Sequence, residues 1–304
     1  MEISKKVKSK IIKILISKNK RLLGTQNASL EKASFIQAID RAIDKDRLVL
    51  SLTKDGEIAY FFIHRIYFAQ ELNQKFIYFS SLYCRDEAVF RKQFKAHIKN
   101  VFSAEKKKYK VKKMLVDVYA DDKYLVNYFS KRGKETYRLL VGKTQYGVNV
   151  LTKNKEKNLE YRVTKATQKD VAKLVKLDRD SHLADKTSRL HLSLKKNDST
   201  KLSREFYKRV IENKTCLVVK NKRGEVAGAA SYFIDENHKR GLIASIFVTK
   251  NFQGKGVSKM LYEQMLSIFL KKKCKYYLGA TTTIKVFSFS EKMKRQELLK
   301  GLIV

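Results

Sequence analysis

The residues with the clearest chemical potential lie where an apolar strand passes into a helix, in the last quarter of the chain. The segment from Ile246 to Ser258 has the sequence IFVTKNFQGKGVS and places Gly254 and Gly256 close together in a chain with only 12 glycines. Glycine allows close backbone approach to a ligand, and the first amides of a helix have no intrahelical acceptor. Those amides attract an anion, and Lys255 adds a positive charge beside them. The segment is therefore predicted to bind a phosphate group.

The spacing of these residues excludes two common phosphate-binding motifs. A Walker loop has two glycines separated by four residues and followed by Lys and Ser or Thr, and the dinucleotide fingerprint needs a third glycine. Neither pattern is present. Apolar residues at Val257, Leu261, Met265 and Ile268 recur at helical spacing, which predicts that a helix follows the turn directly.

This arrangement resembles motif A of the GNAT superfamily of N-acetyltransferases, in which a strand, the pattern Q/R-x-x-G-x-G/A and a helix bind the pyrophosphate of coenzyme A. Gln253, Gly256 and Ser258 occupy the three motif positions, with Ser258 in place of the usual Gly or Ala. Lys250 stands where the family often has proline. The resemblance implies that acetyl-CoA is bound, as co-substrate, by Ile246, Phe247, Val248, Gln253, Gly254, Lys255, Gly256, Val257 and Ser258.

The catalytic residues of the family are only partly present. The resemblance implies a tyrosine that protonates the departing thiolate, and Ser290 stands at that position, within the frame Thr283, Val286, Phe289, Ser290, Lys292 and Lys294. A serine hydroxyl is far less acidic than a phenol, so Ser290, Tyr276, Tyr277 or water remain as alternative proton donors.

No carboxylate that could serve as general base lies on the strand Leu242 to Val248. Asp235, Glu236 and His238 lie on the preceding hairpin connection, where they are expected to be ordinary solvated loop residues. The five histidines show no spacing typical of paired metal ligands, and no metal is expected.

The elements that must position this turn occur twice along the chain. Two hairpin turns, residues 53–59 and 221–227, share Lys, Gly, Glu and Ala at the same spacing between apolar strands. After each hairpin the pattern predicts a strand, a long amphipathic helix, a strand and a short helix. The predicted elements of the first copy are a helix at 30–43, strands at 48–52, 58–63, 76–83, 114–119 and 136–141, and helices through Phe90 to Val101 and 122–131. Those of the second copy are strands at 159–163, 216–219, 226–234 and 242–248, with helices near 171–175, 202–210 and 257–268.

The first copy resembles the same family through a different motif. Its short helix follows the frame that the family places beside the acyl group, at Asp122, Leu125, Tyr128, Phe129, Lys131 and Gly133. Its strand-to-helix turn, residues 83–88, has no glycine and contributes Asp86 and Glu87, whose charges would repel a pyrophosphate. The first copy is therefore predicted to be degenerate and to bind no coenzyme.

These patterns predict an α/β fold with two tandem GNAT-like domains, each a mixed, mostly antiparallel twisted sheet flanked by helices. The predicted parts are a basic amphipathic N-terminal segment at 1–24, a degenerate domain at 25–150, a linker at 151–158 and the acetyl-CoA-binding domain at 159–304. Ile3, Val7, Ile11 and Ile14 line one face of the N-terminal segment, and we expect that face to pack on its own domain rather than on an anionic membrane.

Composition limits the class of protein. With 304 residues and 43% hydrophobic residues, the chain can bury the cores of two domains. Its formal charge of +37 attracts anions, but proline and tryptophan are absent, and we interpret this bias in composition as the main source of the charge. Three cysteines without CxxC spacing exclude a disulfide framework, which favours the cytoplasm. No apolar run is long enough to span a bilayer.

The function expected from these features is transfer of an acetyl group from acetyl-CoA to a primary amine, on a small molecule or a peptide, by direct attack. Two alternatives remain open. Tandem GNAT folds also resemble the aminoacyl-tRNA-dependent peptidoglycan transferases, for which the charge would suit tRNA, although nucleic acid is not the favoured partner. The other alternative is a non-catalytic module that senses coenzyme A or binds through its basic surface, which the missing tyrosine favours.

Overall fold

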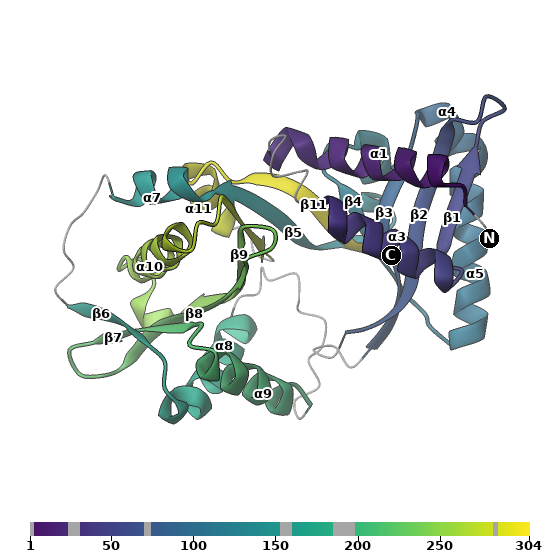
Figure 1. The fold of residues 1–304 in the computed structure, drawn as a ribbon. Helices are drawn as coiled ribbons and strands as arrows, with labels where there is room; N and C mark the ends of the chain where they lie inside the picture. Colours follow the sequence, from purple (N-terminus) through teal and green to yellow (C-terminus); the bar gives the residue numbers. More distant parts are fainter. Residues whose placement is uncertain (1–2, 24–30, 70–73, 153–159, 185–197, 282–284) are drawn as a thin grey trace. The chain divides into compact units, whose positions relative to one another are not determined.

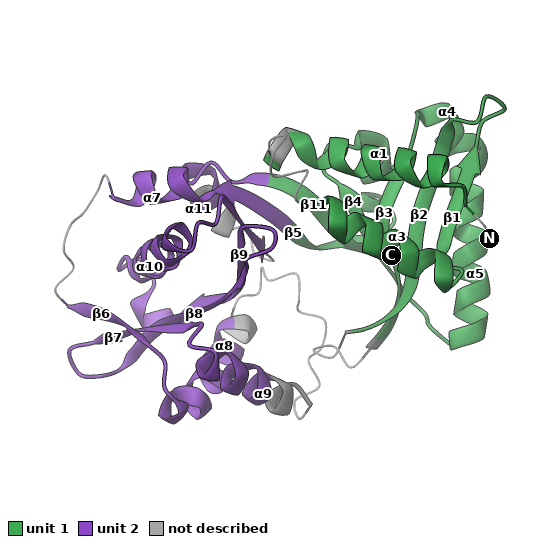
Figure 2. Ribbon diagram, viewed as in Figure 1, with its two compact units in different colours: residues 1–69, 74–138, 297–304 green, residues 70–73, 139–296 purple. Residues whose placement is uncertain are grey.

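The computed structural model describes residues 3–23, 31–69, 74–152, 160–184, 198–281 and 285–304 (Figure 1). The chain divides into two compact units (Figure 2). Unit 1 comprises residues 1–69, 74–138 and 297–304, and unit 2 comprises residues 70–73 and 139–296. In each unit, helices cover both faces of a sheet.

The sheet of unit 1 has the strand order β1-β2-β3-β4-β11-β5. Its strands are β1 (Leu48–Leu52), β2 (Ile58–Ala69), β3 (Gln74–Cys84), β4 (Met114–Tyr119), β11 (Gln296–Ile303) and β5 (Lys134–Lys143). Strands β1, β2 and β3 pair antiparallel, β3 and β4 pair parallel, and β11 pairs antiparallel with β4. A parallel pair needs a long crossover connection, and helices supply it here between β3 and β4.

Two groups of helices enclose that sheet. They are α1 (Lys5–Leu23) and α3 (Lys32–Asp44) on one face, and α4 (Glu87–Val89), the π-helical turn η2 (Phe90–Phe94), α5 (Lys95–Tyr109) and α6 (Lys123–Ser130) on the other. Ile11 and Leu15 of α1 are fully buried against Ile39 of α3 and Phe61 of β2. The expectation that the N-terminal segment packs on its own domain is thus confirmed.

Unit 2 has the strand order β5-β10-β9-β8-β7-β6. Its further strands are β6 (Tyr161–Lys165), β7 (Cys216–Asn221), β8 (Val226–Asp235), β9 (Arg240–Val248) and β10 (Tyr276–Thr281). Strands β6 to β9 pair antiparallel, whereas β9 and β10 pair parallel across a helical crossover. The helices are α7 (Thr144–Thr152), η3 (Gln168–Asp170), α8 (Val171–Ala184), α9 (Asp198–Glu212), η4 (Lys250–Phe252), α10 (Val257–Lys271) and α11 (Lys285–Lys292).

The long helix of unit 2 is the one that the phosphate-binding pattern predicts. Val257, Leu261 and Met265 of α10 are buried, and they pack on the sheet together with Tyr277 of β10. Helices α8 and α9 cover the opposite face, as Figure 1 shows. Each fully buried Leu or Met contributes roughly 1.5–3 kcal/mol to stability, so the apolar face of α10 holds its N-terminus firmly at the end of β9.

Two strands join different parts of the chain. Strand β5 contributes its first residues to unit 1 and its last residues to unit 2, and the C-terminal strand β11 belongs mainly to unit 1. In unit 1, Gly301 pairs with Asp117 of β4, and the Thr136 hydroxyl of β5 donates to the Gly301 carbonyl at 3.0 Å. The sequence did not predict β11. The domain boundaries at 25–150 and 159–304 remain a prediction. The division into compact units differs from them, because it falls after Arg138 and assigns residues 297–304 to unit 1.

Helix α7 lies where the apolar signal weakens along the sequence. Leu151 and Thr152, the first residues of the predicted linker, are the last residues of this helix, and residues 153–158 lie outside the described part. Leu151 is 3% exposed and packs in the same core as Leu261 of α10. Contact with α10, which the local sequence does not reveal, stabilises this short helix.

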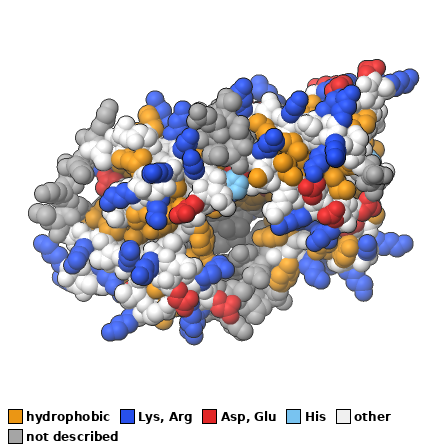
Figure 3. Space-filling model, viewed as in Figure 1, with side chains coloured by type: hydrophobic (Ala, Val, Ile, Leu, Met, Phe, Trp, Pro, Cys, Tyr) orange, Lys and Arg blue, Asp and Glu red, His pale blue; other side chains and the backbone are white. Residues whose placement is uncertain are grey.

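Many positively charged side chains lie on the face of the molecule that Figure 3 shows. These Lys and Arg side chains are scattered over that face. In the described part of the chain, no helix combines the length and the apolar composition that crossing a membrane requires.

Candidate functional site

The predicted phosphate-binding turn connects β9 to α10 within unit 2. Strand β9 ends at Val248, and Thr249 then fixes the chain to β8, because its amide and its hydroxyl both donate to the Ala227 carbonyl, at 2.9 and 3.1 Å. The turn η4 follows, and α10 begins at Val257. The Gln253 side chain donates to the Val248 carbonyl at 3.4 Å, which ties the motif glutamine to the end of the strand.

Both motif glycines have a left-handed backbone. Gly254 has φ of +77° and Gly256 has φ of +78°, values that side chains disfavour. A Cβ atom at either residue would meet no other atom within 4 Å. Glycine is therefore required by the backbone path and not by crowding, and the space over the turn is open.

The N-terminus of α10 lacks the usual side-chain cap. Gly256 is the N-cap residue and supplies no acceptor, and the first turn of α10 contains no acidic residue. The first amides of a helix have no intrahelical acceptor and lie at the positive end of the helix dipole. The ammonium group of Lys255 lies 5.6 Å from the ring centre of Phe252, which holds a positive charge beside these amides. This turn can accept an anion, and a pyrophosphate fits it.

Strand β9 also leaves backbone groups available next to the turn. Its pairing with β10 ends at Ile243 and Gly279, although β9 continues to Val248. The register with β8 shifts at Ala244, which is exposed, so β9 bends away at that residue. The predicted binding residues from Ile246 to Ser258 thus lie in sequence along the diverging end of β9, the turn and the start of α10.

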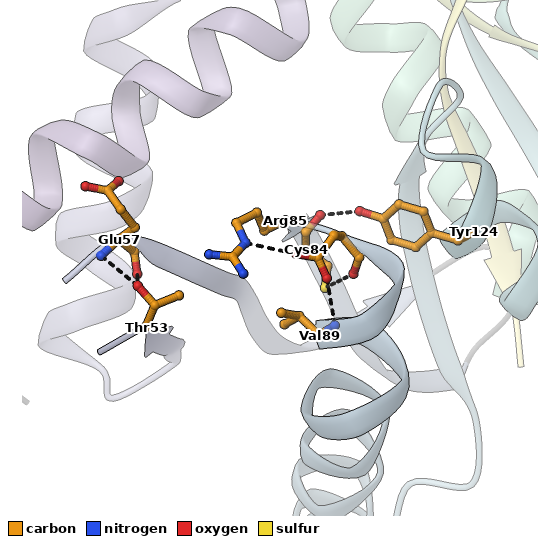
Figure 4. Close-up of polar contacts among 7 residues, drawn as sticks. Thr53, Glu57, Cys84, Arg85, Val89 and Tyr124 are labelled. Carbon is orange, nitrogen blue, oxygen red and sulfur yellow. Dashed lines mark hydrogen bonds and ion pairs between the residues drawn. The ribbon is translucent and has the colours of Figure 1, made fainter. Parts of the chain in front are cut away.

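The corresponding turn of unit 1 is closed by its own carboxylate. The Asp86 side chain caps α4 by accepting from the Val89 amide at 2.8 Å and also pairs with the Arg85 guanidinium at 2.9 Å (Figure 4). The amide of Val89 holds the pKa of Asp86 below its ordinary value, so the capping group stays charged. The Tyr124 hydroxyl donates to the Cys84 carbonyl at the end of β3 (Figure 4). In unit 1, the helix amide that would bind an anionic ligand is therefore already bonded to the Asp86 carboxylate.

The predicted proton donors are buried in unit 2. Ser290 is 2% exposed and Tyr277 is fully buried, and neither hydroxyl has a hydrogen-bond partner among the described residues. Burial raises the pKa of Tyr277 above its ordinary value, which makes this phenol a weaker acid. Tyr276, at 1% exposed, lies on the opposite side of β10 from Tyr277. Their assignment as catalytic groups remains a prediction.

The acidic and basic residues of the β8–β9 connection contact one another. The Asp235 carboxylate accepts from the His238 ring at 2.7 Å and pairs with the Arg240 guanidinium at 3.0 Å. Burial alone would raise the pKa of Asp235, but hydrogen bonds from His238 and the charge of Arg240 outweigh it and lower the pKa. A carboxylate with a lowered pKa is a weaker base, so the geometry supports a structural role for Asp235.

A cavity of about 400 Å³ lies beside the turn and was not expected from the sequence. Helix α8 contributes Lys173, Leu177, Asp180 and Ser181, the β7–β8 turn contributes Glu225 and Val226, and residues 248–253 complete its lining. No local motif marks these α8 residues, because only the packing of α8 brings them to the turn. Within the described residues, no group of three or more His, Cys, Asp and Glu side chains is placed to hold a metal ion.

A second polar group that sequence reasoning missed lies on the α8 and α9 side of β9. The Tyr207 phenol of α9 lies near the Asp178 carboxylate of α8 and the Ser245 hydroxyl of β9, although its hydroxyl makes no hydrogen bond of normal geometry among the described residues. Burial and the negative charge of Asp178 raise the pKa of Tyr207 well above its ordinary value. Ser245 adjoins the register shift of β9, so this group lies next to the bend of that strand.

Residues 182–287 match the model of the Acetyltransferase (GNAT) family. This part of the chain is a GNAT domain. No curated protein matches the sequence as a relative. The match covers the strand, the turn and the helix described above, so the resemblance predicted from Gln253, Gly256 and Ser258 is confirmed.

Several solved structures similar in fold to this chain are described as GNAT proteins. A GCN5-related N-acetyltransferase from Sphaerobacter thermophilus has a TM-score of 0.54 at 10% identity, over 84% of this chain and 79% of that chain. A glucosamine N-acetyltransferase region of a fungal multi-domain β-N-acetylglucosaminidase has a TM-score of 0.54 at 10% identity, over 88% of this chain and 34% of that chain. A tandem GNAT protein from the clavulanic acid biosynthesis pathway has a TM-score of 0.49 at 10% identity, over 84% of this chain and 82% of that chain. The predicted α/β fold class with GNAT-like sheets flanked by helices is confirmed.

Proposed function

We propose that the protein is an N-acetyltransferase that transfers an acetyl group from acetyl-CoA to a primary amine. The observation that carries the proposal is the uncapped N-terminus of α10, with open space over Gly254 and Gly256 and no acidic residue in its first turn. Acetyl-CoA carries a pyrophosphate, which is the kind of anion that such a turn accepts. GNAT family membership of residues 182–287 supports the same donor.

Each part of the site has a distinct task in this proposal. The amides from Gly254 to Ser258 and the Lys255 ammonium hold the pyrophosphate, and the backbone of Ile246 to Val248 holds the pantetheine chain. The cationic acceptor first loses a proton to water, and its neutral nitrogen then forms a bond to the acetyl carbon while the carbon–sulfur bond breaks. The electron pair of that bond leaves with sulfur, and the nitrogen loses a second proton to water. Positioning the two reactants in this way contributes up to about 7–11 kcal/mol toward lowering the barrier.

The acceptor side is formed by α8 and the β7–β8 turn. The cavity beside the turn contains the carboxylates of Asp180 and Glu225, which favour a cationic amine, either a small molecule or a peptide. A cytoplasmic location also belongs to the proposal, and the free, buried state of Cys84, Cys216 and Cys274 supports it.

The experiment that tests this function is calorimetric titration with acetyl-CoA, followed by a thiol-release assay with polyamine and lysine-peptide acceptors. We expect one site per chain, because Asp86 already occupies the corresponding amides of unit 1. Two equal sites would contradict the assignment to unit 2. Binding without thiol release from any acceptor would support a coenzyme A-sensing module instead.

Ser290→Ala is expected to lower kcat less than tenfold. A positioned acid–base group contributes about 10²–10⁴-fold, but a serine hydroxyl is too weakly acidic to protonate a thiolate, whose own conjugate acid has a pKa near 8.5. Because Ser290 is buried, the control is Ser290→Cys, a change of similar volume that should leave acetyl-CoA affinity unchanged. A hundredfold loss of kcat in Ser290→Ala, at unchanged affinity, would show that Ser290 is the acid after all.

A further inference from the structure

The most unusual buried charge of unit 2 belongs to Arg295, directly after α11. The residue is 8% exposed. Its Nη1 atom donates to the Tyr262 hydroxyl at 3.2 Å, and its Nη2 atom donates to the carbonyls of Leu140 at 3.3 Å and Gly279 at 3.0 Å. The guanidinium carbon lies 5.3 Å from the ring centre of Tyr277. All four partners are uncharged.

No described carboxylate pairs with Arg295, and its Nε–H has no acceptor among the described residues. Two other partly buried arginines have carboxylate partners: Arg138 pairs with Glu135 and Glu297, and Arg240 pairs with Asp235. Burying an ion without a counter-ion is costly, and leaving a buried donor unpaired adds to that cost. A site of this kind is suited to a negative charge supplied by a ligand.

The position of Arg295 connects it to the diverging strands. Gly279 is the last residue of β10 that pairs with β9, opposite Ile243. A Cβ atom at Gly279 would lie 3.0 Å from Nη2 of Arg295 and 3.2 Å from Cβ of Ile243. The guanidinium therefore lies against the point at which β9 and β10 separate. In the function proposed above, this opening receives the thioester end of acetyl-CoA.

The hydrogen bonds of the guanidinium indicate which kind of anion it serves. Bidentate binding of a carboxylate or a phosphate uses two parallel N–H groups, one of them on Nη2. Both hydrogens of Nη2 are already donated to the Leu140 and Gly279 carbonyls. The Nε–H and the second hydrogen of Nη1 remain, and they do not form a parallel pair, so the unpaired Nε–H suits a compact, single-atom anion.

We propose that Arg295 stabilises the negative charge that develops on sulfur when the acetyl–sulfur bond breaks, in place of the proton that a tyrosine would supply at Ser290. This inference depends on the proposed acetyltransferase function and adds a residue to its chemistry. A fixed charge aimed at an atom that becomes anionic lowers the barrier without any proton transfer. Charge stabilisation by Arg295 would thus explain both why a cation is buried there and why no tyrosine is needed at Ser290.

The test is the ionisation of the coenzyme A thiol in the bound state, which requires no turnover. Thiolate absorbance is titrated for coenzyme A bound to the wild type, Arg295→Lys and Arg295→Met, and the affinities of coenzyme A and desulfo-coenzyme A are compared from pH 6.5 to 9.5. The free thiol has a pKa near 8.5, and we expect the wild type to lower it by about one unit, which corresponds to tenfold preference for the thiolate. Arg295→Lys should retain part of the shift, and Arg295→Met should abolish it.

Arg162→Met, which removes an exposed charge on the edge strand β6, is the matched control and should behave as the wild type does. If Arg295→Met does not fold, the thiol pKa is compared between the wild type and Arg295→Lys. Both keep a positive charge at this position but place it differently, so a smaller shift in Arg295→Lys still supports the inference. Equal pH dependence for coenzyme A and desulfo-coenzyme A in the wild type would overturn this inference but leave the proposed function intact. Failure of both compounds to bind the wild type would overturn both.

Discussion

Gly256→Asp is expected to weaken acetyl-CoA binding at least about 100-fold without unfolding the protein. The substitution places a carboxylate at the N-cap of α10, where the space is open and no acceptor is present. That carboxylate would accept from the helix amides, as Asp86 accepts from Val89 in unit 1, and would repel the pyrophosphate. Two charge-assisted hydrogen bonds lost at about 1.5–3 kcal/mol each exceed the 2.7 kcal/mol that a 100-fold change requires. Isothermal titration calorimetry measures the change directly.

Gly224→Asp is the matched control for this variant. Gly224 has φ of +77° in the β7–β8 turn, and a Cβ atom there also meets nothing within 4 Å. Both substitutions carry the same backbone strain, of order 1–2 kcal/mol, and the same added charge. We expect equal losses of thermal stability and a loss of affinity only in Gly256→Asp. Equal loss of affinity in the two variants would mean that strain or net charge, and not the turn, controls binding.

The parts of the fold that the sequence predicted well are those with local causes. The strand from Met114 to Tyr119 and the start of α10 at Val257 have the predicted bounds, because apolar periodicity and turn residues define them without help from distant contacts. The turn between β9 and α10 was predicted for the same reason, whereas phosphate binding by it remains a prediction. Gly254 and Gly256 both have positive φ, a conformation that glycine adopts readily, so the residue type alone indicates the turn.

The parts that the sequence did not predict depend on tertiary contacts. Lys300 and Gly301 interrupt the apolar pattern of β11, and its partner β4 lies in the first half of the chain. The α8 lining of the cavity and the position of Arg295 have no local signal either. A lone arginine after a helix appears in sequence as a solvated charge, and only the packing of β5, β10 and α10 around it shows that it is buried.

The two units share a backbone plan but differ in electrostatics. In unit 1, pairing of β3 with β4 ends at Phe79 and Val116, although β3 continues to Cys84, so its strands diverge as β9 and β10 do. The difference lies in the next turn, where a carboxylate caps the helix of unit 1 and glycine leaves that of unit 2 open. Both the residue chemistry and the backbone of this turn therefore distinguish the two units, because Gly254 and Gly256 have positive φ whereas Asp86 is extended.

Gly301→Ala is expected to destabilise unit 1 by about 2–4 kcal/mol while leaving acetyl-CoA affinity unchanged. A Cβ atom at Gly301 would overlap the ring of Tyr137. That ring cannot move freely, because its hydroxyl donates to the buried carboxylate of Asp117, which also accepts from Tyr78. Overpacking costs about 1–3 kcal/mol, and loss of a buried hydrogen bond to a charged group adds to it. At about 2–4 °C per kcal/mol for a unit of this size, the melting temperature should fall by roughly 5–15 °C.

A double-mutant cycle with Tyr137→Ala tests the physical cause of that loss. Removing the ring makes room for the methyl group, so Gly301→Ala should cost less than about 1 kcal/mol in the Tyr137→Ala background, which is a strong coupling for two residues in contact. Gly56→Ala, in the exposed β1–β2 turn of the same unit, introduces backbone strain without any clash. Its loss of stability should therefore be the same in the wild type and in the Tyr137→Ala background. Equal costs of Gly301→Ala in both backgrounds would show that β11 does not pack against β5 as described. A parallel loss of acetyl-CoA affinity would show that unit 1 contributes to the site, contrary to the assignment of binding to unit 2.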